Sequence, residues 1–370
     1  MRIAKSFLMF LLLAVVAVVR PARAQYNVYW GDMHGHTSIS DGKGSLDDYF
    51  THARDVAKLD FVVVSDHDFG NSAPWRMPHE TWTLTQDKVD QYTADGRFVA
   101  IAGYEWTSQP KYWTPEEPLF TGPPKYYNHK NVYFPSRVNY LFSAKDAAYN
   151  SPNLLAQAVL EHGGLIQNNH LDPGPGGRDQ FDYDSSYSSV IVNTEMWPDT
   201  IHYQGKTHQV NGESTVREFL NRGGKTGFVA STDTHEGKPA ARTAVLAREL
   251  TRPAIFEALG QRRNYAVFNA RILLEFKING HWMGEEIEIQ DKPRIEVEVK
   301  GTDAIREVAL LRDGSPIHTL NPAAQNVRFD YVDDAFGQSS YYYLRAVQTD
   351  KDEHGNPSCA WSSPIWVKRQ

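Results

Sequence analysis

Short apolar runs that end in a histidine, an aspartate or a glutamate constrain the fold of this chain more than any other feature. The run Phe61–Val64 is uninterrupted and mostly β-branched, which is typical of a strand buried on both faces. Four further segments have the same character, at residues 98–103, 164–167, 190–192 and 227–230. Between these strands lie segments with helical periodicity, at residues 46–58, 153–162, 215–222 and 253–262. Strands that alternate with helices predict an α/β fold built on a parallel sheet or barrel.

The pattern changes after about Ala270. The strand-like segments there alternate apolar with polar residues in several places, at residues 272–278, 294–300, 308–312, 327–332 and 341–347. Asn279–Gly280 and Asp313–Gly314 are strong hairpin signals. We therefore expect residues 25–269 to form one domain and residues 270–370 to form an antiparallel β-sandwich-like domain, with a short join between them.

The first 24 residues differ from the rest of the chain. Arg2 and Lys5 precede the uninterrupted apolar run Phe7–Val19, and Ala22–Ala24 supplies a small-x-small cleavage pattern. This organisation predicts a secretory signal peptide with cleavage before Gln25. A membrane anchor is the alternative, but the apolar run is short for a spanning helix. We therefore expect a periplasmic or secreted protein, and no later apolar run is long enough to cross a membrane.

The charge balance argues against one class of partner. The net charge of −7 becomes −11 if the four cations of the signal segment are removed with it. An acidic protein without a basic run is a poor candidate for a nucleic-acid-coating surface. Cys359 is the only cysteine, so an internal disulfide is not possible. The sequence leaves the oligomeric state open.

The polar residues at the strand ends are of the types that bind divalent metals. Five separate strand ends carry them, in the order His34 with His36 and Asp41, His67, Glu105, His170, and Asp233 with His235. The carboxyl ends of parallel strands form the ligand-binding face of α/β folds. His34 and His36 point to the same side because alternate side chains of an extended chain share a face. The residues therefore predict a metal centre, and their mixture of imidazoles and carboxylates suits Zn, Mn or Fe rather than Ca or Mg.

Four motifs resemble those of the polymerase-and-histidinol-phosphatase (PHP) family of metal-dependent phosphoesterases. They are His34–His36, Ser40–Gly42, Ser65–His67 and Asp233–His235. More narrowly, Gly31–Thr37 and the tail Ala360–Val367 are similar to an uncharacterised bacterial branch of that family. The resemblance implies that the first domain is a distorted (β/α)7 barrel, and that this barrel holds up to three divalent metal ions.

The resemblance also implies a set of metal ligands. One metal would be bound by His34, His36, Glu105 and Asp233. A second would be bound by Asp41, His67 and His235, with Asp41 standing where many family members have a histidine. Glu105 would bridge to a third metal, whose other ligands resemble His129 and His170. His129 follows an aromatic-rich stretch at residues 71–127, which would either wall the substrate site or pack on the exterior.

Such a centre suggests an exported metal-dependent phosphoesterase. It would hydrolyse a small-molecule phosphomonoester or phosphodiester by in-line attack of a metal-bound hydroxide. Glu195, at the end of another strand, is a candidate substrate contact or proton donor, and Arg242 is a stronger candidate than Lys238 for holding the substrate phosphate. Three aspartates flank the ligands and would either orient the imidazoles or cap strand ends: Asp32, Asp66 and Asp68.

Two other functions remain open. An amidohydrolase-like enzyme would cleave a C–N or C–O bond with the same metal site. A strand-end lysine able to carry a carbamate would favour that enzyme, and the sequence offers no convincing one. A non-catalytic metal-binding protein, with the β domain as its working part, is the second alternative. The presence of every candidate ligand type argues against it, because a decayed site would have lost some of them.

Overall fold

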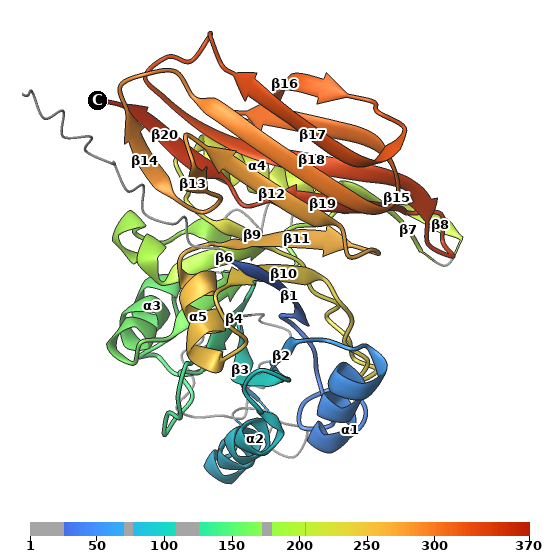
Figure 1. The fold of residues 1–370 in the computed structure, drawn as a ribbon. Coiled ribbons are helices and arrows are strands. Elements are labelled where there is room, and N and C mark those ends of the chain that lie inside the picture. Colours follow the sequence, from blue (N-terminus) through green and yellow to red (C-terminus); the bar gives the residue numbers. More distant parts are fainter. Residues whose placement is uncertain (1–25, 70–76, 109–125, 172–179, 204) are drawn as a thin grey trace, which may run out of the picture.

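A computed structural model describes residues 26–69, 77–108, 126–171, 180–203 and 205–370 of the chain. The predicted signal peptide lies outside the described residues, as do residues 71–76 and 109–125 of the aromatic-rich stretch. The fold is mixed α/β and consists mostly of sheet (Figure 1). Within the described ranges, no helix is both long and apolar enough to span a membrane.

The N-terminal half is built on strands that pair side by side in nearly sequential order. Three of them are parallel: β1 (Asn27–Asp32), β2 (Phe61–Val64) and β3 (Val99–Thr107). Next come β4 (His129–Tyr133), which is antiparallel to both of its neighbours, β5 (Leu165–Asn168), β6 (Ile191–Glu195) and β9 (Gly227–Val229). The last three are again parallel to one another. A parallel bridge between Gly35 and Thr234, just beyond β1 and β9, returns the series to its first strand.

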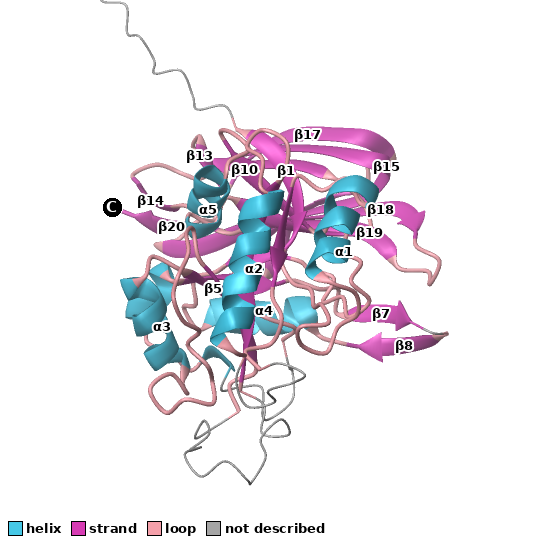
Figure 2. Ribbon diagram, turned by 90° about the horizontal axis from the view of Figure 1, so that it is seen from below, coloured by secondary structure: helices cyan, strands magenta, loops and turns pink. Residues whose placement is uncertain are grey.

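Helices α1 (Leu46–Thr51), α2 (His79–Tyr92), α3 (Pro152–Glu161) and α5 (Arg252–Gly260) lie on the outside of these strands, whereas α4 (Gly212–Asn221) lies beside the C-terminal strands (Figures 1 and 2). A π-helical turn (His52–Val56) extends α1, and a 3-10 turn (Ser185–Ser189) precedes β6. Side chains cap the free N–H groups at the start of α1, α3 and α5: Ser45 forms a capping box with Asp48, and Ser151 and Thr251 each stand before a proline-containing first turn. The sequence patterns predicted every helix except α2.

The N-terminal half ends with two more strands, β10 (Thr243–Ala247) and β11 (Asn264–Phe268), which lie before and after α5 in the chain. From residue 270 onward the described chain contains strands and the connections between them. Their bounds are β12 Leu273–Ile278, β13 His281–Trp282, β14 Glu286–Ile289, β15 Arg294–Arg312, β16 Ser315–Leu320, β17 Ala324–Val332, β18 Ser339–Lys351, β19 Pro357–Ser362 and β20 Ile365–Arg369. A separate hairpin is formed by β7 (Thr200–Tyr203) and β8 (Lys206–Gln209). Both predicted hairpin turns are present, because Asn279, Gly280, Asp313 and Gly314 all have positive φ. The two strands expected at residues 294–300 and 308–312 are instead one long strand, β15.

Strand pairing joins the two parts of the chain. β11 pairs with β19, so that Tyr265 lies opposite Ser362 and Phe268 lies opposite Cys359. β19 also pairs with β18, which belongs wholly to the C-terminal part. The Tyr265 hydroxyl, which is fully buried, donates to the carbonyl of Ile272 at 3.0 Å. The expected boundary near residue 270 is therefore crossed by continuous sheet and by shared core.

Candidate metal centre

Nine candidate ligands come together at the carboxyl ends of the N-terminal strands. They form four overlapping groups of three or four side chains, and the ligand atoms of each group lie within 4.8 Å of one another. The groups are His36, Asp41, His67 and His235; His34, Glu105 and His170; His34, His36 and Asp233; and His67, Glu105 and His129. Every residue predicted as a ligand is a member, including His129, which lies within β4 rather than after it.

The first histidine pair shares a carboxylate. The Nε2 atoms of His34 and His36 lie 3.1 Å apart. Oδ1 of Asp233 lies 3.1 Å from Nε2 of His36 and 3.3 Å from Nε2 of His34. The backbone fixes this approach, because the Asp233 amide donates to the His34 carbonyl at 3.0 Å and the His36 amide donates to the Thr234 carbonyl at 2.9 Å. Two imidazoles and one carboxylate thus converge on one point.

Asp41 belongs to a second group beside the first. Its carboxylate oxygens lie 3.3 Å from Nε2 of His235 and 3.5 Å from Nε2 of His67. His36 connects the two groups, since its Nδ1 lies 3.7 Å from Asp41 while its Nε2 lies next to Asp233. This side of the cluster is open to solvent, with 37% of the Asp41 side chain and 41% of the His235 side chain exposed.

Glu105 lies at the centre of the cluster. Its Oε1 atom is 3.1 Å from Nδ1 of His129, 3.1 Å from Nε2 of His170 and 3.2 Å from Nε2 of His34. Its Oε2 atom is 2.9 Å from Nδ1 of His67. Glu105 is buried on β3, and a parallel bridge aligns it with His67. One carboxylate therefore touches histidines from four different strand ends, as a bridging ligand would.

Two histidines have a partner for the ring nitrogen that faces away from the cluster. Nδ1 of His34 lies 3.0 Å from Oε1 of Glu195, and Nδ1 of His235 lies 3.0 Å from the Asp233 carbonyl. Histidines that bind metals usually have the second ring nitrogen held in this way, because it fixes the tautomer and the ring orientation. The Nε2 atoms of the same rings point into the cluster. The donor set therefore fits divalent metal ions.

Glu195 is fully buried and has both carboxylate oxygens engaged. Oε1 contacts His34 and accepts from Nε2 of Gln167 at 3.2 Å, and Oε2 accepts from the backbone amide of His170. The side chain thus holds two of the candidate ligands. This geometry suits a positioning residue better than the predicted substrate contact or proton donor.

The three flanking aspartates hold the loops that carry the ligands. Asp66 accepts from the Thr37 amide at 2.8 Å, the Thr37 hydroxyl at 2.7 Å and the Ser40 hydroxyl at 2.7 Å, which fixes the turn before Asp41. Asp32 accepts from the Thr232 hydroxyl at 2.6 Å and the Ala240 amide at 2.9 Å.

Asp68 plays the same part for a more distant loop, because it accepts from the Ala144 amide at 2.7 Å. No hydrogen bond from these three carboxylates to a ligand imidazole is recorded within the described residues. The three aspartates therefore stabilise loops, and among the described residues they do not orient the imidazole rings directly.

Electrostatics favours positive charge inside the cluster. Burial alone would lower the pKa of His67, but Glu105 and Asp41 raise it to about 10. Burial likewise opposes the charge of His34, yet Asp233 and Glu105 hold its pKa well above the ordinary value. His129 differs, because burial dominates and lowers its pKa to about 4. The carboxylates thus stabilise positive charge within the cluster, and bound metal ions would supply such charge.

The structure does not bring Arg242 to the cluster. Its Nη1 donates to Asn269 Oδ1 at 3.1 Å, and its guanidinium lies 4.9 Å from the centre of the Phe268 ring. In this position the Arg242 side chain does not reach the candidate ligands, contrary to its predicted role in holding a substrate phosphate there. Lys238 is exposed, and its backbone amide donates to the Thr234 hydroxyl at 3.2 Å.

Sequence reasoning missed several amides that surround Glu105. The Asn169 side chain donates to Oε1 of Glu105 at 2.8 Å and to Oδ1 of Asn131 at 2.9 Å. Asn131 in turn donates to the Met33 carbonyl at 2.9 Å. The one signal in the sequence is position, since Asn169 precedes His170 at a strand end.

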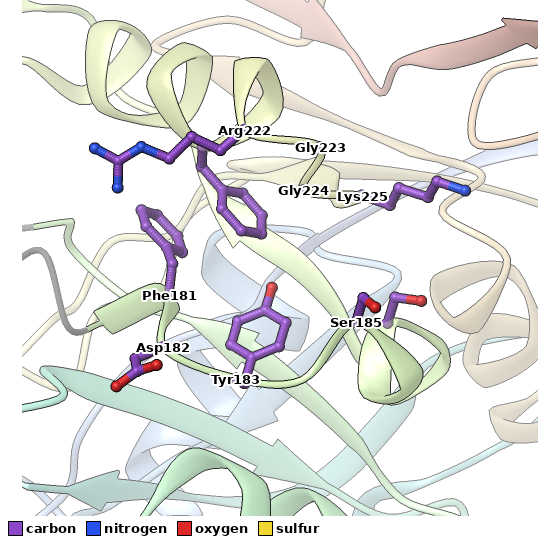
Figure 3. A pocket seen from close by; sticks show the side chains of 10 residues that line it. Phe181, Asp182, Tyr183, Ser185, Arg222, Gly223, Gly224 and Lys225 are labelled. Carbon is purple, nitrogen blue, oxygen red and sulfur yellow. The ribbon is translucent and has the colours of Figure 1, made fainter.

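A cavity of about 630 Å³ lies away from the candidate ligands (Figure 3). Its lining comes from residues before β6 and β9, including Ser185 and Lys225, whereas the candidate ligands follow the strands. Phe181 and Phe219 stack there with ring centres 4.1 Å apart. Chemistry at the metal cluster therefore does not take place in this cavity.

Comparison with known proteins gives relatives without an established function. An uncharacterised protein of Chlamydia muridarum is 27% identical over 92% of this chain, and one of Chlamydia pneumoniae is 26% identical over 92%. The chain spans 57% of the length of each of these relatives. A crystal structure of a two-domain protein from Bacteroides vulgatus, containing a predicted PHP-like metal-dependent phosphoesterase, is 14% identical with a TM-score of 0.47, covering 93% of this chain and 95% of that one. No protein-family model matches the sequence.

Proposed function

We propose that the protein is an exported metal-dependent hydrolase of small phosphate esters, whose N-terminal region is a distorted seven-stranded barrel and whose residues 270–370 form a β-sandwich-like domain. One observation carries the proposal: nine histidine and carboxylate side chains meet in four overlapping groups, with Glu105 shared between two of them. The groups agree with a centre for up to three ions of Zn, Mn or Fe. The motif resemblance to PHP phosphoesterases supports a phosphate ester as substrate.

The groups suggest which residues would hold each ion. With the ligand sets that the resemblance implies, His34, His36, Asp233 and Glu105 would hold one, Asp41, His67 and His235 a second, and Glu105, His129 and His170, which meet at Oε1 of Glu105, a third. Bound ions of this kind activate water as a nucleophile near neutral pH and offset the negative charge that develops on phosphoryl oxygens. Asp41 and His235 lie on the solvent side, so an ester would approach past them.

Residues of the chain hold this geometry in place. Glu195 keeps the His34 ring turned so that Nε2 faces the cluster, and it also fixes the backbone at His170. Asp66 fixes the turn that carries Asp41. Gly42 has no side chain because a Cβ there would lie 2.5 Å from the carbonyl carbon of His36. The site is preorganised by contacts that involve no substrate.

The amidohydrolase alternative has less support. It would be favoured by a lysine that could carry a carbamate between metals, and β4 does contain a buried lysine, Lys130. Its ammonium donates to Asn168 Oδ1 at 2.6 Å and to the Gln180 carbonyl at 2.7 Å, rather than to a candidate ligand. Lys130 adjoins His129, and neighbouring side chains of a strand point to opposite faces. A bridging carbamate at Lys130 does not fit this arrangement.

The test combines metal analysis with activity. Protein purified from its native compartment is assayed for Zn, Mn and Fe. The same protein is then given p-nitrophenyl phosphate, bis-p-nitrophenyl phosphate and a panel of amides and lactones. We expect between two and three metal ions per chain and turnover of a phosphate ester. Ester turnover should be lost in His34→Ala and retained in His281→Ala, a histidine on the hairpin strand β13. If the protein hydrolyses neither phosphate ester with any of the three metals, the proposal is refuted.

A further inference from the structure

We propose that a cavity between the N-terminal half and the C-terminal strands binds a phosphate-like oxyanion. The cavity has a volume of about 390 Å³ and is separate from the metal cluster in its lining residues. It is lined by the segment around Arg242, by Arg271 and by the loop Asp350–Ser358. The inference does not depend on the proposed function, because none of its groups is a candidate metal ligand.

Arg242 is the central group of this cavity. Its Nη1 donates to Asn269 Oδ1, a neutral acceptor, and its planar group rests on Phe268. Its Nε atom is buried and has no hydrogen-bond partner. The N–H groups of a buried guanidinium are costly to leave unsatisfied. Arg242 therefore has capacity for an anion that the chain itself does not supply.

The other two cations of the lining also lack ion pairs. Nη2 of Arg271 donates to the carbonyls of Ala57 and Lys58 at 2.9 and 2.7 Å, and its charge interacts with the Asp60 carboxylate only through space. Lys351 is exposed at the rim. Within the described part of the chain, no carboxylate lies within 4.0 Å of the charged nitrogens of Arg242, Arg271 or Lys351.

The two carboxylates of the lining are engaged with neutral donors. Asp352 accepts from the Asn356 amide at 2.8 Å and from the side chains of Asn356 and Asn269 at 2.9 and 3.2 Å. Asp350 accepts from Gln348 at 2.8 Å and from the Ser358 hydroxyl at 2.7 Å. These hydrogen bonds stabilise the loop. Neither carboxylate forms an ion pair within 4.0 Å of the three cations, although Asp32 and Asp352 favour the charged form of Arg242 through space.

The larger cavity of Figure 3 shows the contrast. Its two cations, Arg222 and Lys225, each pair with a carboxylate, Glu218 and Glu286. Charge there is balanced by the chain. Among the described residues, the cavity at Arg242 combines a buried guanidinium that has no ion pair with two further cations that also lack ion pairs. Guanidinium groups match oxyanions through parallel N–H donors, which indicates phosphate or a phosphate monoester as the ligand.

The test measures binding of inorganic phosphate and glycerol 2-phosphate to the full chain by titration calorimetry, in metal-loaded protein and after chelation. Chelation separates this site from binding at metal ions. We expect saturable binding of at least one probe under both conditions. Arg242→Gln should weaken it by about tenfold or more, because a charged hydrogen bond is lost. Lys351→Gln, an exposed change that does not disturb the core, should weaken it less, and Arg222→Gln should leave it unchanged.

Two results would overturn the proposal. One is the absence of saturable binding of either probe to chelated protein. The other is unchanged affinity in both Arg242→Gln and Lys351→Gln. Because chelated protein cannot hydrolyse by a metal-dependent route, failure here leaves the phosphoesterase proposal intact, and failure of that proposal leaves this one intact.

Discussion

Replacing Glu213 by alanine should destabilise the whole chain, although this residue is not a candidate metal ligand. Glu213 is buried in the first turn of α4 and receives three hydrogen bonds from C-terminal strands. The donors are the Tyr343 hydroxyl at 2.9 Å, Nη1 of Arg345 at 3.1 Å and Nε1 of Trp361 at 3.0 Å. One carboxylate thus joins the N-terminal half to β18 and β19.

The expected loss follows from these contacts. All three hydrogen bonds have the same carboxylate as acceptor, and a hydrogen bond to a charged group contributes about 1.5 to 3 kcal/mol. Removing one partner of a buried pair costs about 3 to 5 kcal/mol in comparable cases. Arg345 keeps a second partner, Glu307, at 3.0 Å, which argues against a larger loss. For a cooperative chain of 370 residues, a loss of this size lowers Tm by about 4 to 6 °C.

Differential scanning calorimetry and urea unfolding of Glu213→Ala measure the effect. The matched control is Glu218→Ala on the same helix, since Glu218 is 61% exposed and pairs only with Arg222. We expect the control to stay within about 0.5 kcal/mol of the wild type. A Glu213→Ala protein as stable as this control would refute the reasoning. Two separate unfolding transitions in the wild type would show that the shared sheet and core do not couple the two parts.

Three further predictions concern the site and the core. Glu195→Gln should weaken metal binding by about 10- to 100-fold through its contact with His34, measured by competition with a chelating dye, while Glu218→Gln should not. Metal removal should lower the free energy of unfolding by about 4 kcal/mol relative to metal at a thousand times its Kd, and equal thermal stability with and without chelator would contradict this. Burial raises the pKa of Cys359 to about 12, so the thiol should resist iodoacetamide at pH 8 until urea unfolds the chain; rapid labelling of folded protein would show the thiol to be accessible.

The predictable elements are those whose buried side chains are apolar. β2 is a continuous apolar run, and its bounds follow from the sequence. β3 begins with such a run, but it continues past the expected end at residue 103 to Thr107, so that Glu105 lies within the strand. α2 was missed because its buried face includes Thr85 and Gln86 beside Trp82 and Val89. The buried Gln86 side chain binds the backbone of a neighbouring segment, because its oxygen accepts from the Val138 amide at 2.8 Å. Hydrophobic periodicity cannot reveal a helix whose inner face is partly polar.

β4 escaped prediction for the same reason. Lys130 and Asn131 are both fully buried in it, and neither residue type is common in strand interiors. The polar groups are satisfied across the sheet, because Lys130 donates to Asn168 and Asn131 accepts from Asn169. Such pairs depend on which strands become neighbours. Motif resemblance located His129 where strand patterns could not.

Sequence proximity to a motif is a weak guide to where a side chain points. Arg242 follows the Asp233–His235 motif closely, but its amide donates to the Gly31 carbonyl at 3.0 Å and its carbonyl accepts from Val267 at 2.8 Å. These bonds set the chain antiparallel to β1 and lead it away from the cluster. Arg242 then meets Phe268 and Asn269. The path of the backbone therefore carries Arg242 away from the candidate metal ligands. It places the guanidinium, which has no ion pair within the described chain, beside the loop Asp350–Ser358, and this placement is the basis for an oxyanion site there.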